Sequence, residues 1–341
     1  MKIKTKDVRN LVSILDDIVA VYKDEHPKIK RNWRTYEQRV TERLKTAFRE
    51  LKPLVHEAVS TITFVSGERR GAKATLTVEQ RVLALLIKHI IGKSNRNMSS
   101  MFVIFSLLSD IDVSYKTVER FYSDQEVIAV LHNLHRIILK KKGVNEIEGS
   151  GDGTGLSLTI KVNYENYAQK LKDKVKDART QSKKEYKKKL FAYSFKLMDL
   201  KSRMYVGFGT SFKSENEAFL ETLKMVQKTK IKLSSIRLDR YYSCQEYVRL
   251  IREKFGNEKI FLIPKSNATL KAKDWEWKRI LYDFTMDPMI YLEDYFQRNQ
   301  SESGFSEDKK RTGWQLGQKK ADRIDTADML TLLWHNLHWL G

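Results

Sequence analysis

The chain has 341 residues, of which 41% are hydrophobic, so it is long enough to bury a sizeable core in two or three domains. Its 64 Lys and Arg residues outnumber 43 Asp and Glu residues, giving a formal net charge of +21 at pH 7. This excess favours a polyanionic partner over a merely Lys-rich surface, and the spread of basic residues through aromatic-containing segments favours nucleic acid over membrane.

The first part of the chain, 1–144, is predicted to be an all-α region because apolar residues recur three and four positions apart. Thr77 and Gln80 have the spacing of a capping box, and the helix that follows is expected to end at Gly92. A shorter second helix is predicted over 99–108.

Ser114 is the expected cap of a third, polar helix that carries Lys116 and Arg120. The order of helices and turn near 78–123 is that of a helix-turn-helix, in which Lys116 and Arg120 contact DNA. The alternative is a set of small packed helices that touch no DNA.

From about residue 145 the pattern changes to the two-residue repeat of strands. Strands are predicted over 156–162, 191–197, 204–208, 236–239 and 260–263, with helices over 215–227 and 242–255. This order predicts an α/β fold with an RNase H-like mixed five-stranded sheet and flanking helices, preceded by the all-α region. The second domain is expected to span 145–341.

Two segments interrupt this plan. A basic insertion, about 163–189, either binds phosphates or forms a solvated charged helix. A connecting segment, about 265–288, carries Trp275 and Trp277, which fit core positions better than stacking on an unpaired base.

Two aspartates lie at the expected strand ends of this sheet. Asp152, in a glycine-rich segment, is predicted to precede the first alternating strand, and Asp239 ends the fourth. If the strands are adjacent, both carboxylates meet, as metal-dependent phosphoryl transfer requires. Taken alone, each has a structural alternative, since Asp-Gly is a common turn and an Asp after a strand often caps a helix.

Tyr295, Arg298, Glu302 and Lys309 fit the spacing Y-(2)-R-(3)-E-(6)-K, which places four side chains on one face of a helix. In the structural interpretation they form a solvated stripe in which Glu302 pairs with Arg298 or Lys309. In the functional interpretation Glu302 is a third metal ligand, flanked by groups that hold phosphates.

With these motifs, residues 145–341 resemble the DDE transposases of bacterial and archaeal insertion sequences that carry the Y-R-E-K motif on an RNase H-like domain. Asp152-Gly153-Thr154 and Asp239-Arg240-Tyr241 are similar to the first two motifs of that family. The resemblance implies that Asp152, Asp239 and Glu302 are catalytic and coordinate two Mg²⁺ ions, for which Mn²⁺ can substitute. It also implies DNA contacts, which we assign to Tyr295, Arg298, Lys309, Arg240 and Thr154.

The reaction implied is hydrolysis at the ends of the element, followed by transfer of the freed 3′-hydroxyls to target DNA. The expected partner is double-stranded DNA, bound by a homodimer in the synaptic complex. The alternatives are a DDE-type nuclease that does not join DNA and a non-catalytic DNA-binding protein on the same fold.

The expected location is the cytoplasm, in association with the nucleoid. The single cysteine, Cys244, excludes an intramolecular disulfide and fits a reducing compartment. The most apolar stretches, 11–22 and 82–91, contain charged residues, and the second is too short to cross a bilayer.

Overall fold

The computed structural model describes residues 3–27, 32–64, 76–92, 113–158, 191–256, 258–271, 274–313, 315–318 and 320–341. The helix predicted over 99–108 and the basic insertion at 163–189 lie outside these residues. Among the helices that the structure describes, none combines the length and apolar character needed to cross a bilayer.

The N-terminal region is helical, as predicted. Its described helices are α1 (Thr5–Ser13), α2 (Leu15–Glu25), α3 (Trp33–Ser60), α4 (Val78–Ile91), α6 (Tyr115–Phe121) and α7 (Gln125–Lys141). The capping box of α4 is confirmed, since Thr77 and Gln80 exchange backbone-to-side-chain hydrogen bonds of 2.9 and 3.2 Å. Gly92 ends the helix with a left-handed φ of 68°, and Ser114 caps α6.

The second region is built on one mixed sheet, so the predicted α/β class is confirmed. Its strands are β1 (Glu146–Leu158), β2 (Phe191–Asp199), β3 (Tyr205–Ser211), β4 (Lys232–Arg237), β5 (Lys259–Phe261) and β6 (Gln315–Leu316). The strand order is β3-β2-β1-β4-β5, with β6 parallel to the end of β1. Strands β2 and β3 are antiparallel to their neighbours, and β1, β4 and β5 are mutually parallel. The sheet has six strands, whereas five were predicted. The additional strand is β6, which has only two residues.

Strand β1 begins about ten residues before the predicted start at 156. Its residues Gly149 and Ser150 pair with β2 on one side and β4 on the other, whereas Gly151, Gly153 and Gly155 pair with β2, and these ladders satisfy backbone polar groups. The glycines also leave room for neighbours, since a Cβ at Gly151 would lie 2.7 Å from Leu238 and Phe195. Tertiary pairing therefore overrides the weak strand propensity of glycine.

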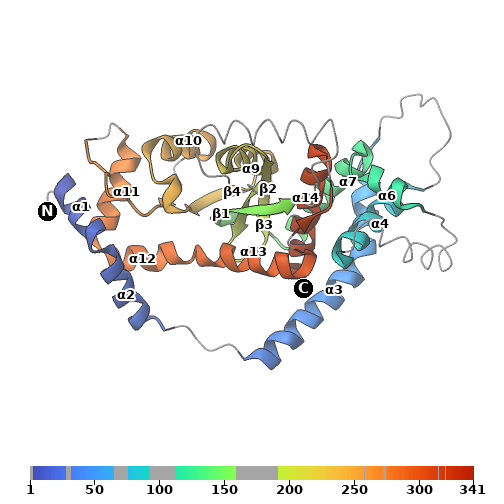
Figure 1. Ribbon diagram of the computed structural model, residues 1–341, viewed down its shortest axis with the longest axis horizontal. Coiled ribbons are helices and arrows are strands. Elements are labelled where there is room, and N and C mark those ends of the chain that lie inside the picture. Colours follow the sequence, from blue (N-terminus) through green and yellow to red (C-terminus); the bar gives the residue numbers. More distant parts are fainter. Residues whose placement is uncertain are drawn as a thin grey trace, which may run out of the picture.

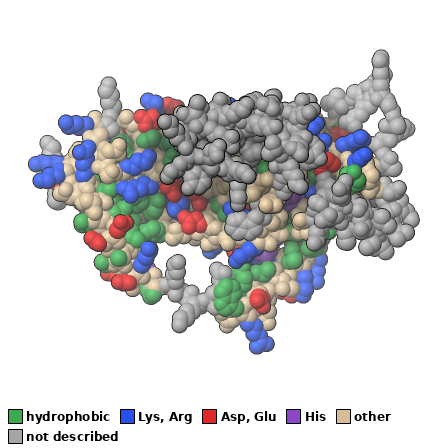
Figure 2. Space-filling model, viewed as in Figure 1, with side chains coloured by type: hydrophobic (Ala, Val, Ile, Leu, Met, Phe, Trp, Pro, Cys, Tyr) green, Lys and Arg blue, Asp and Glu red, His purple; other side chains and the backbone are tan. Residues whose placement is uncertain are grey.

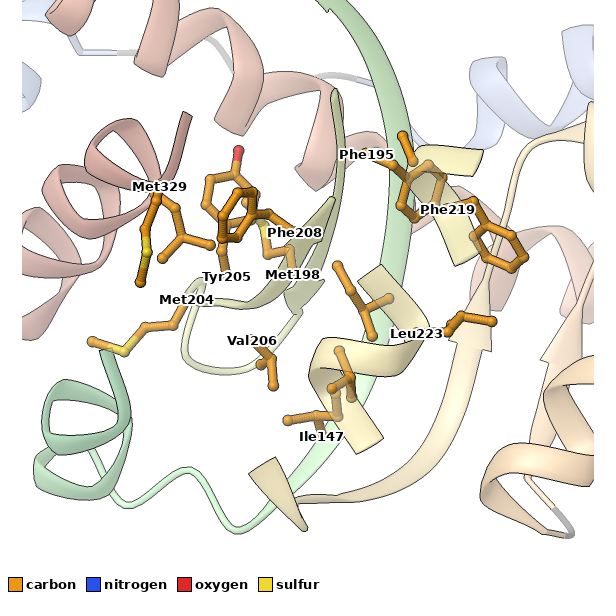
Figure 3. Close-up of a cluster of buried hydrophobic side chains, with 14 of the residues drawn as sticks. Ile147, Phe195, Met198, Met204, Tyr205, Val206, Phe208, Phe219, Leu223 and Met329 are labelled. Carbon is orange, nitrogen blue, oxygen red and sulfur yellow. The ribbon is translucent and has the colours of Figure 1, made fainter. Parts of the chain in front are cut away.

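Helices cover both faces of the sheet (Figure 1). The helices that follow β3 are α9 (Glu215–Thr229), α10 (Gln245–Phe255), α11 (Trp275–Met286), α12 (Pro288–Phe296), α13 (Asn299–Thr312) and α14 (Ala321–Leu340). Figure 3 shows apolar side chains on both sides of the strands, with Phe195 near Phe219 of α9 and Met198 and Tyr205 on the side of Met329 of α14. Strand β2 is therefore buried on two faces, whereas its alternation predicted one.

Helix α14 joins the two regions. It is buried along most of its length and packs against α3, α4 and α7 as well as β3. One continuous core thus runs from the N-terminal helices into the sheet. The predicted domain boundary at 144 and 145 falls between α7 and β1 and remains a prediction.

The connecting segment at 265–288 contains α11, and both of its tryptophans lie in the first turn of this helix. Trp277 is 5% exposed and belongs to the core, whereas Trp275 is 68% exposed. The core assignment is therefore correct for Trp277 and wrong for Trp275, because two side chains that are two positions apart on a helix point in directions about 200° apart, which is nearly to opposite sides.

Candidate active site

Asp152 was predicted to precede the first strand, but it lies inside β1. Its register partner on β2 is Lys196. The carboxyl is largely enclosed, with 18% of the side chain exposed, and burial raises its pKa to about 6 although Arg298 and the Gly153 N–H favour ionisation.

Asp239 follows the end of β4 and is brought to the same edge of the sheet. Because β4 is parallel to β1, with Ser150 opposite Arg237, both strands lead their aspartates in the same direction. The Oδ1 atom of Asp239 accepts a 2.9 Å hydrogen bond from the Tyr241 N–H and caps the short 3-10 helix η1 (Arg240–Tyr242). This carboxylate remains 44% exposed.

The Y-R-E-K residues were predicted to share one helix, and this prediction is wrong. Tyr295 lies in α12, Glu302 and Lys309 lie in α13, and Arg298 stands at the junction as the residue that precedes α13. The backbone of Arg298 keeps α-helical angles, with φ −51° and ψ −32°. The chain therefore changes helix with little disruption, and the motif still faces the sheet.

The three acidic residues converge on the Arg298 guanidinium. Its Nη1 atom lies 3.7 Å from Asp152 Oδ1 and 3.6 Å from Asp239 Oδ2. Its Nη2 atom donates a 2.8 Å hydrogen bond to Glu302 Oε1. Side chains separated by up to 150 positions in the sequence therefore surround a single cation.

Arg298 is held in a confined position. Its side chain is 12% exposed, and its Nε and Nη1 atoms have no hydrogen-bond partner among the described residues. The guanidinium carbon lies 5.8 Å from the centre of the Tyr295 ring. Burial would lower the pKa of Arg298, but Tyr295 and the three carboxylates raise it above its usual value.

Helix α13 is fixed to β1 beyond the acidic centre. Lys309 Nζ donates a 2.7 Å hydrogen bond to Thr154 Oγ1, two residues after Asp152. The hydroxyls of Ser150 and Ser301 lie 2.6 Å apart. Burial lowers the pKa of Lys309, which lies close to the sheet.

The three carboxylates could serve as ligands of a hard divalent cation, although in this structure they surround the Arg298 guanidinium. Within the described part of the chain, no three His, Cys, Asp or Glu side chains are grouped as a metal site. Asp152, Asp239 and Glu302 nevertheless offer carboxylate oxygens, the ligands that Mg²⁺ prefers, and Arg298 marks a place where positive charge is stabilised.

The remaining predicted residues lie around or away from this centre. Arg240 is exposed beside Asp239, whereas Lys116 and Arg120 are exposed on α6, which packs against α4 at the other end of the molecule (Figure 1). Tyr295 is only 6% exposed, which leaves its ring little surface for the predicted DNA contact.

Several residues around the centre were not identified from the sequence. Tyr242 donates a 2.8 Å hydrogen bond to Glu215 of α9, whose carboxyl lies against Gly153. Lys196 and Arg237 are fully buried cations on the strands that flank β1. The sequence carries no local signal for these two cations, because β2 and β4 also contain the polar residues Ser194 and Ser235 and the burial of the cations depends on helices that follow later in the chain.

The fold and this geometry describe an α/β protein whose sheet carries an acidic centre, completed by a helix that supplies a glutamate and by the arginine that precedes this helix. The chain is 37% identical over 336 residues to the "probable transposase for insertion sequence element ISA1214" of Archaeoglobus fulgidus, covering 98% of this chain and 96% of the relative. It belongs to this family of insertion-sequence transposases. No protein-family model and no solved structure matches the chain.

Proposed function

We propose that the protein is a DDE transposase that uses Mg²⁺ to cut double-stranded DNA at transposon ends and to join the 3′-hydroxyls to target DNA. The observation that carries the proposal is the contact of Asp152, Asp239 and Glu302 with one guanidinium, at 3.7, 3.6 and 2.8 Å. The strand order β3-β2-β1-β4-β5, with helices on both faces, supports an RNase H-like catalytic domain.

Each residue has a distinct part in this proposal. Asp152, Asp239 and Glu302 would hold two Mg²⁺ ions, or Mn²⁺ in their place. Bound there, the ions would activate the attacking hydroxyl and stabilise the leaving oxygen. Arg298 and Lys309 would supply positive charge for phosphate oxygens. The ring of Tyr295, which lies next to the Arg298 guanidinium, would orient it.

The charge distribution supports DNA as the partner. The formal charge of +21 favours binding to a polyanion, and Figure 2 shows Lys and Arg side chains gathered at the end of the molecule that holds α1 and α11. We propose a homodimer for the DNA-bound complex, because two transposon ends must be held side by side, and an association with the nucleoid.

The test is the Asp239→Asn variant, assayed on DNA from the flanks of the gene with Mg²⁺. Asparagine keeps an oxygen for the Tyr241 N–H and removes the negative charge, so we expect DNA binding to persist and cleavage to disappear. Asp287 is a matched control, because it also caps a helix through a side-chain oxygen, and Asp287→Asn should cleave normally.

The products separate the candidate reactions. Joined DNA from the wild-type protein supports a transposase, and cleavage without joining identifies a nuclease. Unchanged cleavage by Asp239→Asn would refute the metal-site assignment, and absence of cleavage by the wild-type protein would favour a DNA-binding protein.

A further inference from the structure

Two buried cations, Lys196 and Arg237, lie on the strands on either side of β1. Lys196 on β2 is the register partner of Asp152, and Arg237 on β4 pairs with Ser150 and stands two residues before Asp239. Removing a charge from water costs several kcal/mol unless partners compensate for it. The partners therefore indicate what these cations do.

Arg237 binds the end of α12. Its Nε atom donates a 2.7 Å hydrogen bond to the backbone oxygen of Asp294, and its Nη2 atom lies 3.2 Å from Asp294 Oδ1. The third nitrogen donates to Ser235 Oγ at 2.8 Å. Asp294 directly precedes Tyr295, so this contact fixes the start of the Y-R-E-K motif against β4.

Lys196 binds α13 and α14. Its Nζ atom lies 3.7 Å from Asp308 Oδ2 and 3.1 Å from Asp328 Oδ1. The other oxygen of Asp308 accepts a 2.8 Å hydrogen bond from His335. Asp308 directly precedes Lys309, so this contact fixes the end of the motif against β2.

The two contacts bracket the motif along the helices that run beneath the sheet in Figure 1. We propose that Arg237 and Lys196 are positioning residues, which fix α12 and α13 at both ends of the motif so that Arg298 and Glu302 face the two aspartates. This inference rests on the proposed function, because its consequence is the spacing of the metal-binding carboxylates.

A role in stability alone does not account for this arrangement. A buried ion pair often contributes no more to stability than apolar side chains of the same volume. Groups that orient metal ligands, in contrast, typically change metal affinity by about 10- to 100-fold when they are lost. Metal affinity is therefore the measurement that separates positioning from support of the fold.

The experiment measures Mn²⁺ binding by electron paramagnetic resonance, without DNA, at a temperature where every variant is folded. Lys196→Met and Arg237→Met should each weaken Mn²⁺ binding by about tenfold or more. Lys196→Arg keeps the charge and should recover part of the affinity.

The matched control is Arg81→Met, which breaks the buried contacts of Arg81 with Asp124 and Glu126 between α4 and α7. It should lower the thermal midpoint and leave Mn²⁺ affinity within about twofold of wild type. If Lys196→Met and Arg237→Met bind Mn²⁺ as Arg81→Met does, the positioning role is wrong while the proposed function stands. Absence of Mn²⁺ binding by the wild-type protein would overturn both.

Discussion

Arg298 offsets the repulsion between three carboxylates that the fold brings to one place. Ionised carboxylates that lie around one guanidinium repel one another. The partial burial of Asp152 further raises the free energy of its ionised form. The guanidinium reaches all three groups, which no single-point cation such as a lysine ammonium would do with the same geometry. A divalent cation bound by these oxygens would take over the same electrostatic role.

Replacing Arg298 by methionine should therefore make the protein depend on metal for its stability. In EDTA we expect Arg298→Met to lower the free energy of unfolding by about 2 kcal/mol, because the carboxylates lose their charged hydrogen-bond donor. Added Mg²⁺ should recover most of this loss. Denaturant unfolding with and without Mg²⁺ measures both effects.

Arg240 provides the control, since it is an exposed cation next to Asp239. Arg240→Met should unfold like the wild-type protein in EDTA and gain no more from Mg²⁺ than wild type does. An equal gain from Mg²⁺ in the two variants would mean that Arg298 does not compensate the acidic centre.

At the scale of elements, the site depends on how closely helix α9 approaches the sheet. A Cβ at Gly209 of β3 would lie 2.2 Å from the Ala218 carbonyl oxygen and 2.8 Å from the Thr222 nitrogen. Both are backbone atoms of α9, so the helix would have to move as a unit. The first turn of α9 carries Glu215, the hydrogen-bond partner of Tyr242.

Gly209→Ala is expected to lower the free energy of unfolding by about 3 kcal/mol, as overpacking of a close helix contact does. Gly317→Ala serves for comparison, because a Cβ there has no neighbour within 4 Å and the residue is exposed, so its stability should not change. Chemical denaturation of the two variants gives the difference. Equal stability would show that α9 does not pack this closely.

The elements themselves follow from the sequence where local pattern and tertiary environment agree. Helix α4 begins and ends as predicted because Thr77, Gln80 and Gly92 fix its ends locally. The early start of β1 was missed because its glycines are stabilised there by pairing with β2 and, at Gly149, also with β4, which the local pattern does not show. The break between α12 and α13 was also missed, since Arg298 keeps helical angles and leaves no signal.

At the scale of the whole molecule, the sequence predicted that Asp152 and Asp239 lie close together, but it did not predict the groups that support them. Asp152 and Asp239 meet because β1 and β4 are parallel neighbours, which the predicted order of elements implied. Lys196 and Arg237 could not be distinguished among 64 basic residues, because their burial depends on helices far along the chain. A buried charge is visible only once its partners are known.

A single packed core joins the N-terminal helices, the sheet and α14, and the acidic centre lies on the sheet that this core supports. The central claim is that Asp152, Asp239 and Glu302 share divalent cations at this sheet edge. Crystals of the full chain soaked in Mn²⁺ test it through anomalous diffraction. We predict manganese peaks among the three carboxylates, with the Arg298 guanidinium moved aside. Manganese bound only elsewhere, with Arg298 still in contact with all three carboxylates, would contradict the account.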